Sequence, residues 1–142
     1  FSIVYTWDRW LHLYEKNLQA YGLHDKCASM RSIHADPTKP PLSPDGKKEI
    51  EKSIERESRA AIEEDGADVI VLGSSTMYEY AEYLSHSLPV PLLNPTNVAV
   101  MFCEMSLKLG LRHSKKAFAT PLELHDDWIT RMVDQVAATK RS

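Results

Sequence analysis

The chain has 142 residues, of which 43% are hydrophobic, and this is enough for one ordinary soluble domain with its own core. Its 17 basic residues are scattered among 20 acidic ones, and the net charge of -3 with no basic block argues against a nucleic-acid partner. No apolar run is close to the roughly 20 residues that cross a bilayer, and the start FSIVYTWDRW lacks a signal-peptide pattern. We therefore expect a cytoplasmic protein without a membrane partner.

The two cysteines, Cys27 and Cys103, are too few for a disulfide framework and lack the spacing of metal ligands. We interpret both as reduced core residues and expect no metal. The six histidines are scattered, and each is interpreted as a surface or packing residue. The first residue is Phe1, already inside an apolar run, which suggests that an N-terminal part is missing.

The first third of the chain predicts strand, helix, strand and loop. The run FSIVYT, residues 1–6, is typical of a buried strand. A helical apolar stripe follows and ends at Gly22, a good C-cap; its members are Trp7, Trp10, Leu11, Tyr14, Leu18 and Tyr21. Residues 26–33 predict a second strand. The segment 34–46 contains four prolines, so it predicts a long loop of the kind found at active sites.

The middle of the chain continues the alternation. A helix begins at Ser43-Pro44 and runs to Gly66, and ADVIVLG, residues 67–73, predicts a strand covered on both faces. Residues 74–88 predict a helix, residues 90–94 a strand, and residues 95–110 a helix that is apolar nearly all round and hence deeply buried. On the helix that ends at Gly66, the buried side is predicted to consist of Ile50, Ile54, Ala61 and Ile62.

Four strand and helix repeats in alternation predict the α/β class, with a four-stranded parallel sheet flanked by helices on both faces. We assign residues 1–113 to this domain. Residues 114–142 form a C-terminal segment that contains the capping box Thr120-Pro121-Leu122-Glu123. This segment predicts a last helix, with Leu122, Ile129, Met132, Val133 and Val136 on one stripe.

Ligands of open parallel sheets bind beyond the carboxyl ends of the strands. Three predicted strand ends are polar and uncharged: Thr6, the turn Gly73-Ser74-Ser75-Thr76, and Asn94. A glycine lets a ligand approach the backbone, and the N–H groups of residues 75–77 are candidates to bind a carboxylate or an oxyanion. The alternative is that these residues only cap helices, Thr76 with Glu79 three residues on, and Asn94 at the next helix.

The segments DGADVIVLGSSTM, PVPLLNPTNVAV and LKLGLRHSKKAFATP, together with the opening strand and helix, resemble the C-terminal half of a hydantoin racemase, in the aspartate/glutamate racemase superfamily. The turn of that family usually reads Leu-Gly-Cys-Ala-Gly-Met. Ser74 therefore falls on the position of the catalytic cysteine, and Ser75 and Thr76 replace Ala and Gly.

The resemblance implies a cofactor-independent racemase or epimerase of hydantoin-like or related amide and ureide substrates, with one thiol from each of two similar α/β domains. It places Ser74 at a catalytic position and implies substrate binding by Thr6, Gly73, Ser75, Thr76 and Asn94. The last helix would pack on the other domain, and a homo-oligomer is compatible with the family. Without the thiol, we expect this chain to be inactive as a racemase.

Two alternatives stay open. The first is that the chain belongs to a decarboxylase or a cis-trans isomerase of the same superfamily, since such relatives share the enolate-stabilising turn. The second is that the chain is a non-catalytic protein whose Ser-Ser-Thr turn binds a small carboxylate or ureide.

Overall fold

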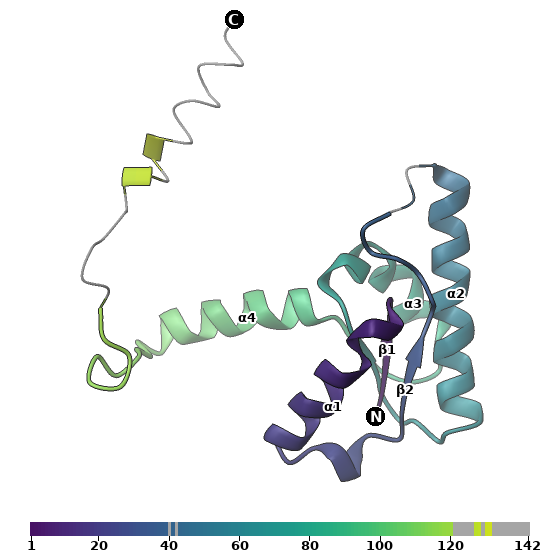
Figure 1. Ribbon diagram of the computed structural model, residues 1–142, viewed down its shortest axis with the longest axis horizontal. Helices are drawn as coiled ribbons and strands as arrows, with labels where there is room; N and C mark the ends of the chain where they lie inside the picture. The colour runs from purple at the N-terminus through teal and green to yellow at the C-terminus, as the bar shows by residue number, and fades with distance from the viewer. Residues whose placement is uncertain (40, 42, 121–126, 129, 132–142) are drawn as a thin grey trace, which may run out of the picture. The chain divides into compact units, whose positions relative to one another are not determined.

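The computed structural model describes residues 1–39, 41, 43–120, 127–128 and 130–131. The chain forms two compact units, Phe1–Met105 and Ser106–Ser142, and the first unit holds the sheet (Figure 1). The stripe of the predicted C-terminal helix lies outside the described residues. That prediction therefore stays untested.

The sheet has four parallel strands in the order β2-β1-β3-β4. They are β1 (Ser2–Tyr5), β2 (Ser29–Ser32), β3 (Ile70–Leu72) and β4 (Leu92–Leu93). The predicted α/β class and the four-stranded parallel sheet are confirmed. Each strand is shorter than the apolar run that predicted it.

One face of the sheet is covered by α2 (Pro44–Glu63) and by the 3-10 helix η3 (Ser75–Tyr80) with α3 (Ala81–Ser87). Val4 and Leu72 of the sheet form one apolar cluster with Ile54 of α2 and Leu84 of α3, and each is at most 1% exposed. Burial of such side chains contributes about 1.5–3 kcal/mol each. The buried side predicted for α2 is confirmed, with Ile54 and Ala61 fully buried and Ile50 and Ile62 packed against them.

The other face is covered by α1 (Leu11–Ala20), which follows the 3-10 turn η1 (Asp8–Trp10) and precedes η2 (His24–Lys26). Ile3 and Tyr5 of β1 pack there against Leu18, with Tyr14 at the margin. Figure 1 shows α1 and α2 on opposite sides of β1. The predicted C-cap is confirmed: Gly22 has a φ of 64°, a left-handed conformation that favours glycine, and its N–H donates to the carbonyl of Gln19. Of the predicted stripe, Leu18 is buried, whereas Leu11 and Tyr21 are 36% and 77% exposed, so the stripe is only partly confirmed.

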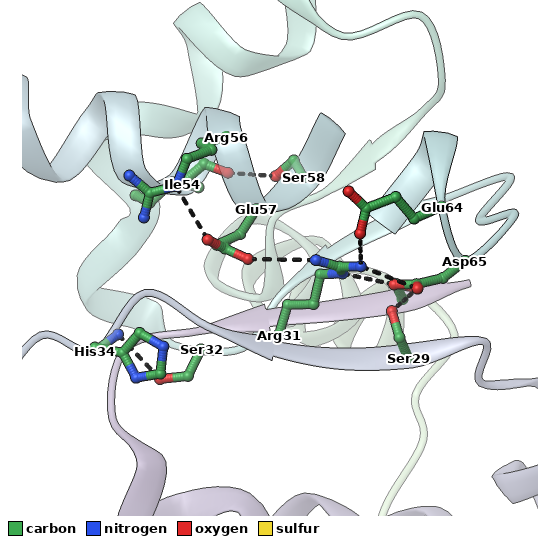
Figure 2. Close-up of polar contacts among 11 residues, drawn as sticks. Ser29, Arg31, Ser32, His34, Ile54, Arg56, Glu57, Ser58, Glu64 and Asp65 are labelled. Carbon is green, nitrogen blue, oxygen red and sulfur yellow. Dashed lines mark hydrogen bonds and ion pairs between the residues drawn. The ribbon is translucent and has the colours of Figure 1, made fainter. Parts of the chain in front are cut away.

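A cluster of charges joins β2 to the end of α2 (Figure 2). Arg31 donates from Nε to Asp65 Oδ2 at 2.6 Å and from Nη2 to Asp65 Oδ1 at 3.0 Å and Glu64 Oε2 at 2.6 Å. Glu57 lies 3.6 Å from Arg31 Nη1. The pKa of Asp65 is lowered to about 2, first by the hydrogen bond from Arg31 and then by one from Ser29. This bidentate ion pair between Arg31 and Asp65 holds β2, an edge strand, against the end of α2.

Two burial predictions are wrong. The helix α4 (Pro95–Lys108) was expected to be deeply buried, yet none of its residues is buried within the described part of the chain. Met101 and Phe102 are 61% and 60% exposed, and Cys103, expected in the core, is exposed as well. Cys27 is half-buried. The apolar composition of α4 therefore did not predict its burial correctly.

Candidate functional site

Three polar strand ends and the end of β2 lie along the carboxyl edge of the sheet. The register pairs Val4 with Leu72, so Thr6 and Ser74 each lie two residues beyond the last pair of neighbouring strands. Asn94 directly follows β4. All parallel strands present their carboxyl ends at one edge, which is where this class of sheet binds ligands.

The turn after β3 is held by Ser74. Its Oγ lies 2.8 Å from Thr76 Oγ1 and accepts from the Thr76 N–H at 3.3 Å, while its carbonyl accepts from the Met77 N–H at 3.1 Å. The predicted capping box of Thr76 with Glu79 is wrong, because the helix starts earlier, as the 3-10 helix η3, and Ser74 is its N-cap. Two of the three N–H groups expected to meet a ligand are therefore engaged within the turn.

Gly73 is fixed by close packing on the α1 face. A Cβ added there would lie 2.6 Å from Tyr5 Cβ and 3.1 Å from Tyr14 Oη. The Tyr14 hydroxyl donates to the Gly73 carbonyl at 2.6 Å, and burial raises the pKa of Tyr14, so the phenol stays a donor. Sequence reasoning placed Tyr14 on the buried stripe but missed this contact, since nothing in the spacing connects residues so far apart.

A cavity of about 530 Å³ opens at this edge between β1, the segment after β2, the first turns of α2, and η3. Thr6 and Thr76 both line it. Thr6 is only 7% exposed, and its Oγ1 has no hydrogen-bond partner among the described residues. A buried hydroxyl without a partner costs about 1–3 kcal/mol.

The α2 side of the cavity is tied to η3 by an ion pair. Lys47 Nζ lies 2.7 Å from Glu79 Oε2, and the pKa of Lys47 is raised by the hydrogen bond with that carboxylate. Glu79 lines the cavity together with Tyr80, whose pKa is raised by burial. Asp36 also lines it, and the pKa of Asp36 is lowered by hydrogen bonds from Thr38. Acceptor oxygens thus outnumber cations in the lining, which suits a ligand rich in N–H donors.

His34 is the lining residue that sequence reasoning missed. It follows β2, its φ is 56°, and its N–H donates to Ser32 Oγ at 3.0 Å. Its Nδ1 lies 2.9 Å from Asp8 Oδ2, and the pKa of Asp8 is lowered by this hydrogen bond. Ligands of parallel sheets bind beyond the carboxyl ends of the strands. Had this rule been applied to the second strand as well as to the other three, it would have selected His34.

Asn94 does not line this cavity. It lines a second hollow of about 440 Å³ with Asn97, Tyr78 and Glu82. The predicted cap is confirmed, since Asn94 Oδ1 accepts from the Thr96 N–H at 3.0 Å and its carbonyl accepts from Val98. Gly73, Ser74 and Ser75 line neither hollow. The structure thus brings Thr6 and Thr76 together and leaves Asn94 apart.

The described residues contain no group of three or more His, Cys, Asp or Glu side chains arranged to hold a metal. Within that same part of the chain, none of the helices combines the length and the apolar character that a bilayer crossing requires.

A four-stranded parallel sheet with flanking helices, a polar turn and a cavity at its carboxyl edge defines the α/β class. The family model for Asp/Glu/hydantoin racemases matches residues 1–103. The chain belongs to this family.

The curated relatives are hydantoin racemases. The one from Pseudomonas sp. (strain NS671) is 31% identical over 118 residues, which are 81% of this chain and 45% of the relative. The one from Paenarthrobacter aurescens is 34% identical over 73 residues, 51% of this chain and 31% of the relative. The chain thus spans about half the length of the Pseudomonas relative.

Two solved structures resemble the fold. An allantoin racemase from Klebsiella pneumoniae superimposes with a TM-score of 0.77 at 31% identity, covering 87% of this chain and 50% of that one. An allantoin racemase from Pseudomonas fluorescens gives 0.74 at 32% identity, covering 87% of this chain and 52% of that one. A racemase, and so an isomerase, is the kind of enzyme to which the chain is related.

Proposed function

We propose that this chain forms one half of a cofactor-independent racemase site for hydantoin-like or related ureide substrates. The observation that carries the proposal is the position of the Gly73-Ser74 turn, at the carboxyl edge of the sheet and within residues 1–103, which match the racemase family model. Racemisation moves a proton from one face of a carbon to the other, so a complete site needs a proton-transfer group on each face. One α/β half supplies one face.

Ser74 occupies the place where the family resemblance puts a catalytic thiol. A thiol has an ordinary pKa of about 8.5 and is readily ionised near neutral pH, whereas a serine hydroxyl is not. The substitution changes one atom and keeps the shape of the turn. On this proposal the chain retains ligand binding and has lost racemisation by that thiol.

The exposed apolar side of α4 supports the presence of a second half. Val98, Met101, Phe102 and Met105 are between 43% and 61% exposed, and apolar patches of this kind mark interaction surfaces. We assign this surface to contact with the other half or with another copy of the chain. The protein is further proposed to be cytoplasmic, because Cys27 and Cys103 are free thiols.

The test compares the natural chain with Ser74→Cys and Ser74→Ala, incubated in D₂O with 5-substituted hydantoins and with allantoin. Proton NMR follows loss of the C5 proton, and polarimetry follows racemisation. The cysteine variant should exchange the C5 proton at least about 100-fold faster than the alanine variant, because a positioned base contributes about 10²–10⁴-fold. Equal rates for the two variants, with the fold intact by circular dichroism, would reject the racemase proposal and favour a decarboxylase or a binding protein.

A further inference from the structure

We propose that Tyr14 is a positioning residue for the side chain at position 74: by donating to the Gly73 carbonyl, its hydroxyl fixes the peptide group that carries the Ser74 N–H. The inference rests on the proposed function, which makes position 74 the reacting one. It gives the helix α1 a part in the chemistry of a turn that follows β3.

The hydrogen-bond ladder between β1 and β3 ends directly before the turn. Its last bond runs from the Gly73 N–H to the Val4 carbonyl at 2.7 Å. One step further in the same register, the Gly73 carbonyl would accept from the Thr6 N–H. In the described chain the Tyr14 hydroxyl takes that place, at 2.6 Å. A side chain, rather than the sheet, therefore sets the direction of the peptide group between Gly73 and Ser74.

The planarity of the peptide bond passes this constraint on to Ser74. The carbonyl of Gly73 and the N–H of Ser74 belong to one rigid trans unit and point in opposite directions. A hydroxyl that fixes the carbonyl therefore also fixes the N–H. Ser74 follows in an extended conformation, with φ of -140° and ψ of 140°, and its Oγ lies 2.8 Å from Thr76 Oγ1. The place of the side chain at position 74 thus depends on the Tyr14 contact.

Tyr14 is well suited to hold this peptide group. Its ring lies 4.9 Å from the ring of Tyr5, centroid to centroid, and a Cβ at position 73 would lie 3.1 Å from its Oη, so the phenol reaches the backbone only because residue 73 is a glycine. Burial raises the pKa of Tyr14, and the hydroxyl therefore keeps its proton and stays a donor near neutral pH.

The hydrogen bond also changes the charge that a group at position 74 meets. A donor on the Gly73 carbonyl polarises the peptide and strengthens the Ser74 N–H as a donor. It offsets the partial negative charge of the carbonyl oxygen, next to a group that must be an anion in order to remove a proton. Neither the Ser74 N–H nor the Ser75 N–H donates to another described residue, so both are available to an anion. The Tyr14 contact should therefore favour the ionised form of a thiol at position 74.

The experiment uses the whole chain and compares Ser74→Cys with Ser74→Cys combined with Tyr14→Phe. The rate of alkylation by iodoacetamide is measured across about pH 5–10, and mass spectrometry of chymotryptic peptides follows each thiol separately. We expect Tyr14→Phe to raise the pH midpoint of the introduced thiol by about 0.5–1 unit, the effect of losing one hydrogen bond. The exposed thiol of Cys103 is the internal reference and should keep its midpoint.

Two control variants separate this effect from a loss of stability, and each is combined with Ser74→Cys. Tyr21→Phe removes a phenol hydroxyl at a 77% exposed position directly after the last residue of α1. Ile54→Val removes a methyl group from a fully buried side chain of α2, on the opposite face of the sheet, and lowers stability. Both should leave the midpoint of the introduced thiol unchanged.

The charged groups on the elements around the turn are the same in all of these variants. On the α1 side, Asp8 and Glu15 add to burial in raising the pKa of Tyr5. On the η3 side, Glu79 is paired with Lys47. A change in midpoint that Tyr14→Phe alone produces therefore belongs to the hydrogen bond of its hydroxyl.

Deuterium uptake at C5 of allantoin gives a second readout that separates this inference from the proposed function. Where Ser74→Cys catalyses exchange, the pH midpoint of exchange should rise together with that of the thiol when Tyr14→Phe is added. A raised thiol midpoint without any exchange would reject the racemase proposal and still support the role of Tyr14. An unchanged thiol midpoint in Tyr14→Phe, or an equal rise in Ile54→Val, would overturn the role of Tyr14 and leave the racemase proposal standing.

Discussion

The hydroxyl of Tyr14, on α1, donates a hydrogen bond of 2.6 Å to the carbonyl oxygen of Gly73, the residue before the Ser74 turn. The contact spans 59 positions of the chain and fixes the turn from the α1 side of the sheet. The ring of Tyr14 also lies 4.9 Å from that of Tyr5, centroid to centroid. The turn at the carboxyl edge is therefore positioned by α1 as well as by its own N-cap.

Tyr14→Phe should remove this hydrogen bond while keeping the ring. The Gly73 carbonyl then loses its phenolic donor, and we expect the free energy of unfolding to fall by about 1 kcal/mol. Urea unfolding followed by tryptophan fluorescence measures the change. Tyr21→Phe, at a 77% exposed position on the end of the same helix, is the control and should stay within about 0.5 kcal/mol of the natural chain. Equal effects of the two variants would argue that the Gly73 contact does not stabilise the turn.

Gly73→Ala should be more harmful than its size suggests. The added methyl group would lie 2.6 Å from Tyr5 Cβ, a position that cannot move without shifting the strand. We expect a loss of about 1–3 kcal/mol of stability, as for other overpacked core sites. Adding Tyr14→Phe to this variant should not restore the loss, because the Tyr5 contact remains. Recovery in the double variant would place the strain at the Tyr14 hydroxyl instead.

The Arg31 and Asp65 pair should make stability depend on pH. The folded-state pKa of Asp65 is lowered from 3.8 to about 2, so its contribution is present above 3.8 and is lost as the pH falls towards 2. Solvent reaches 23% of the Asp65 side chain, and we expect the contribution near pH 7 to be about 1–2 kcal/mol.

Asp65→Asn therefore should lower stability at pH 7 and match the natural chain near pH 2, measured by urea unfolding across that interval. Asp68→Asn, at an exposed position nearby, is the matched control and should show no such convergence. A difference between natural chain and Asp65→Asn that stays constant from pH 7 to pH 2 would contradict the ion-pair account.

Phe102→Ser should change association more than folding. Phe102 is 60% exposed on α4, so we expect the free energy of unfolding to change by no more than about 0.5 kcal/mol. An uncovered apolar side promotes association, and the variant should be shifted towards the monomer in sedimentation velocity runs at several concentrations. Lys108→Ser, on the last residue of the same helix, serves as the control. If Phe102→Ser associates as strongly as the natural chain, α4 is not the contact surface.

The local pattern of apolar and polar residues was sufficient to predict the order of strands and helices and the α/β class. Short apolar runs separated by amphipathic stretches, with Gly22 after α1 and Ser43-Pro44 before α2, predict alternating strands and helices because each signal acts within a few residues. The same alternation required a parallel sheet, and the rule for its carboxyl edge selected Thr6 and the Ser74 turn. Composition failed for α4, which was predicted to be deeply buried and has no buried residue in the described part of the chain.

Tertiary structure alone decided which of these residues meet. The contact of Tyr14 with Gly73 and the pairing of His34 with Asp8 each join segments whose separation along the chain carries no periodic signal. Thr6 and Thr76 share one cavity, while Asn94 faces another, because the strand order β2-β1-β3-β4 places β1 beside β3 and leaves β4 at the edge. Residue type and spacing act locally, whereas the distances between side chains at a sheet edge depend on how the strands are ordered and how the helices pack on them.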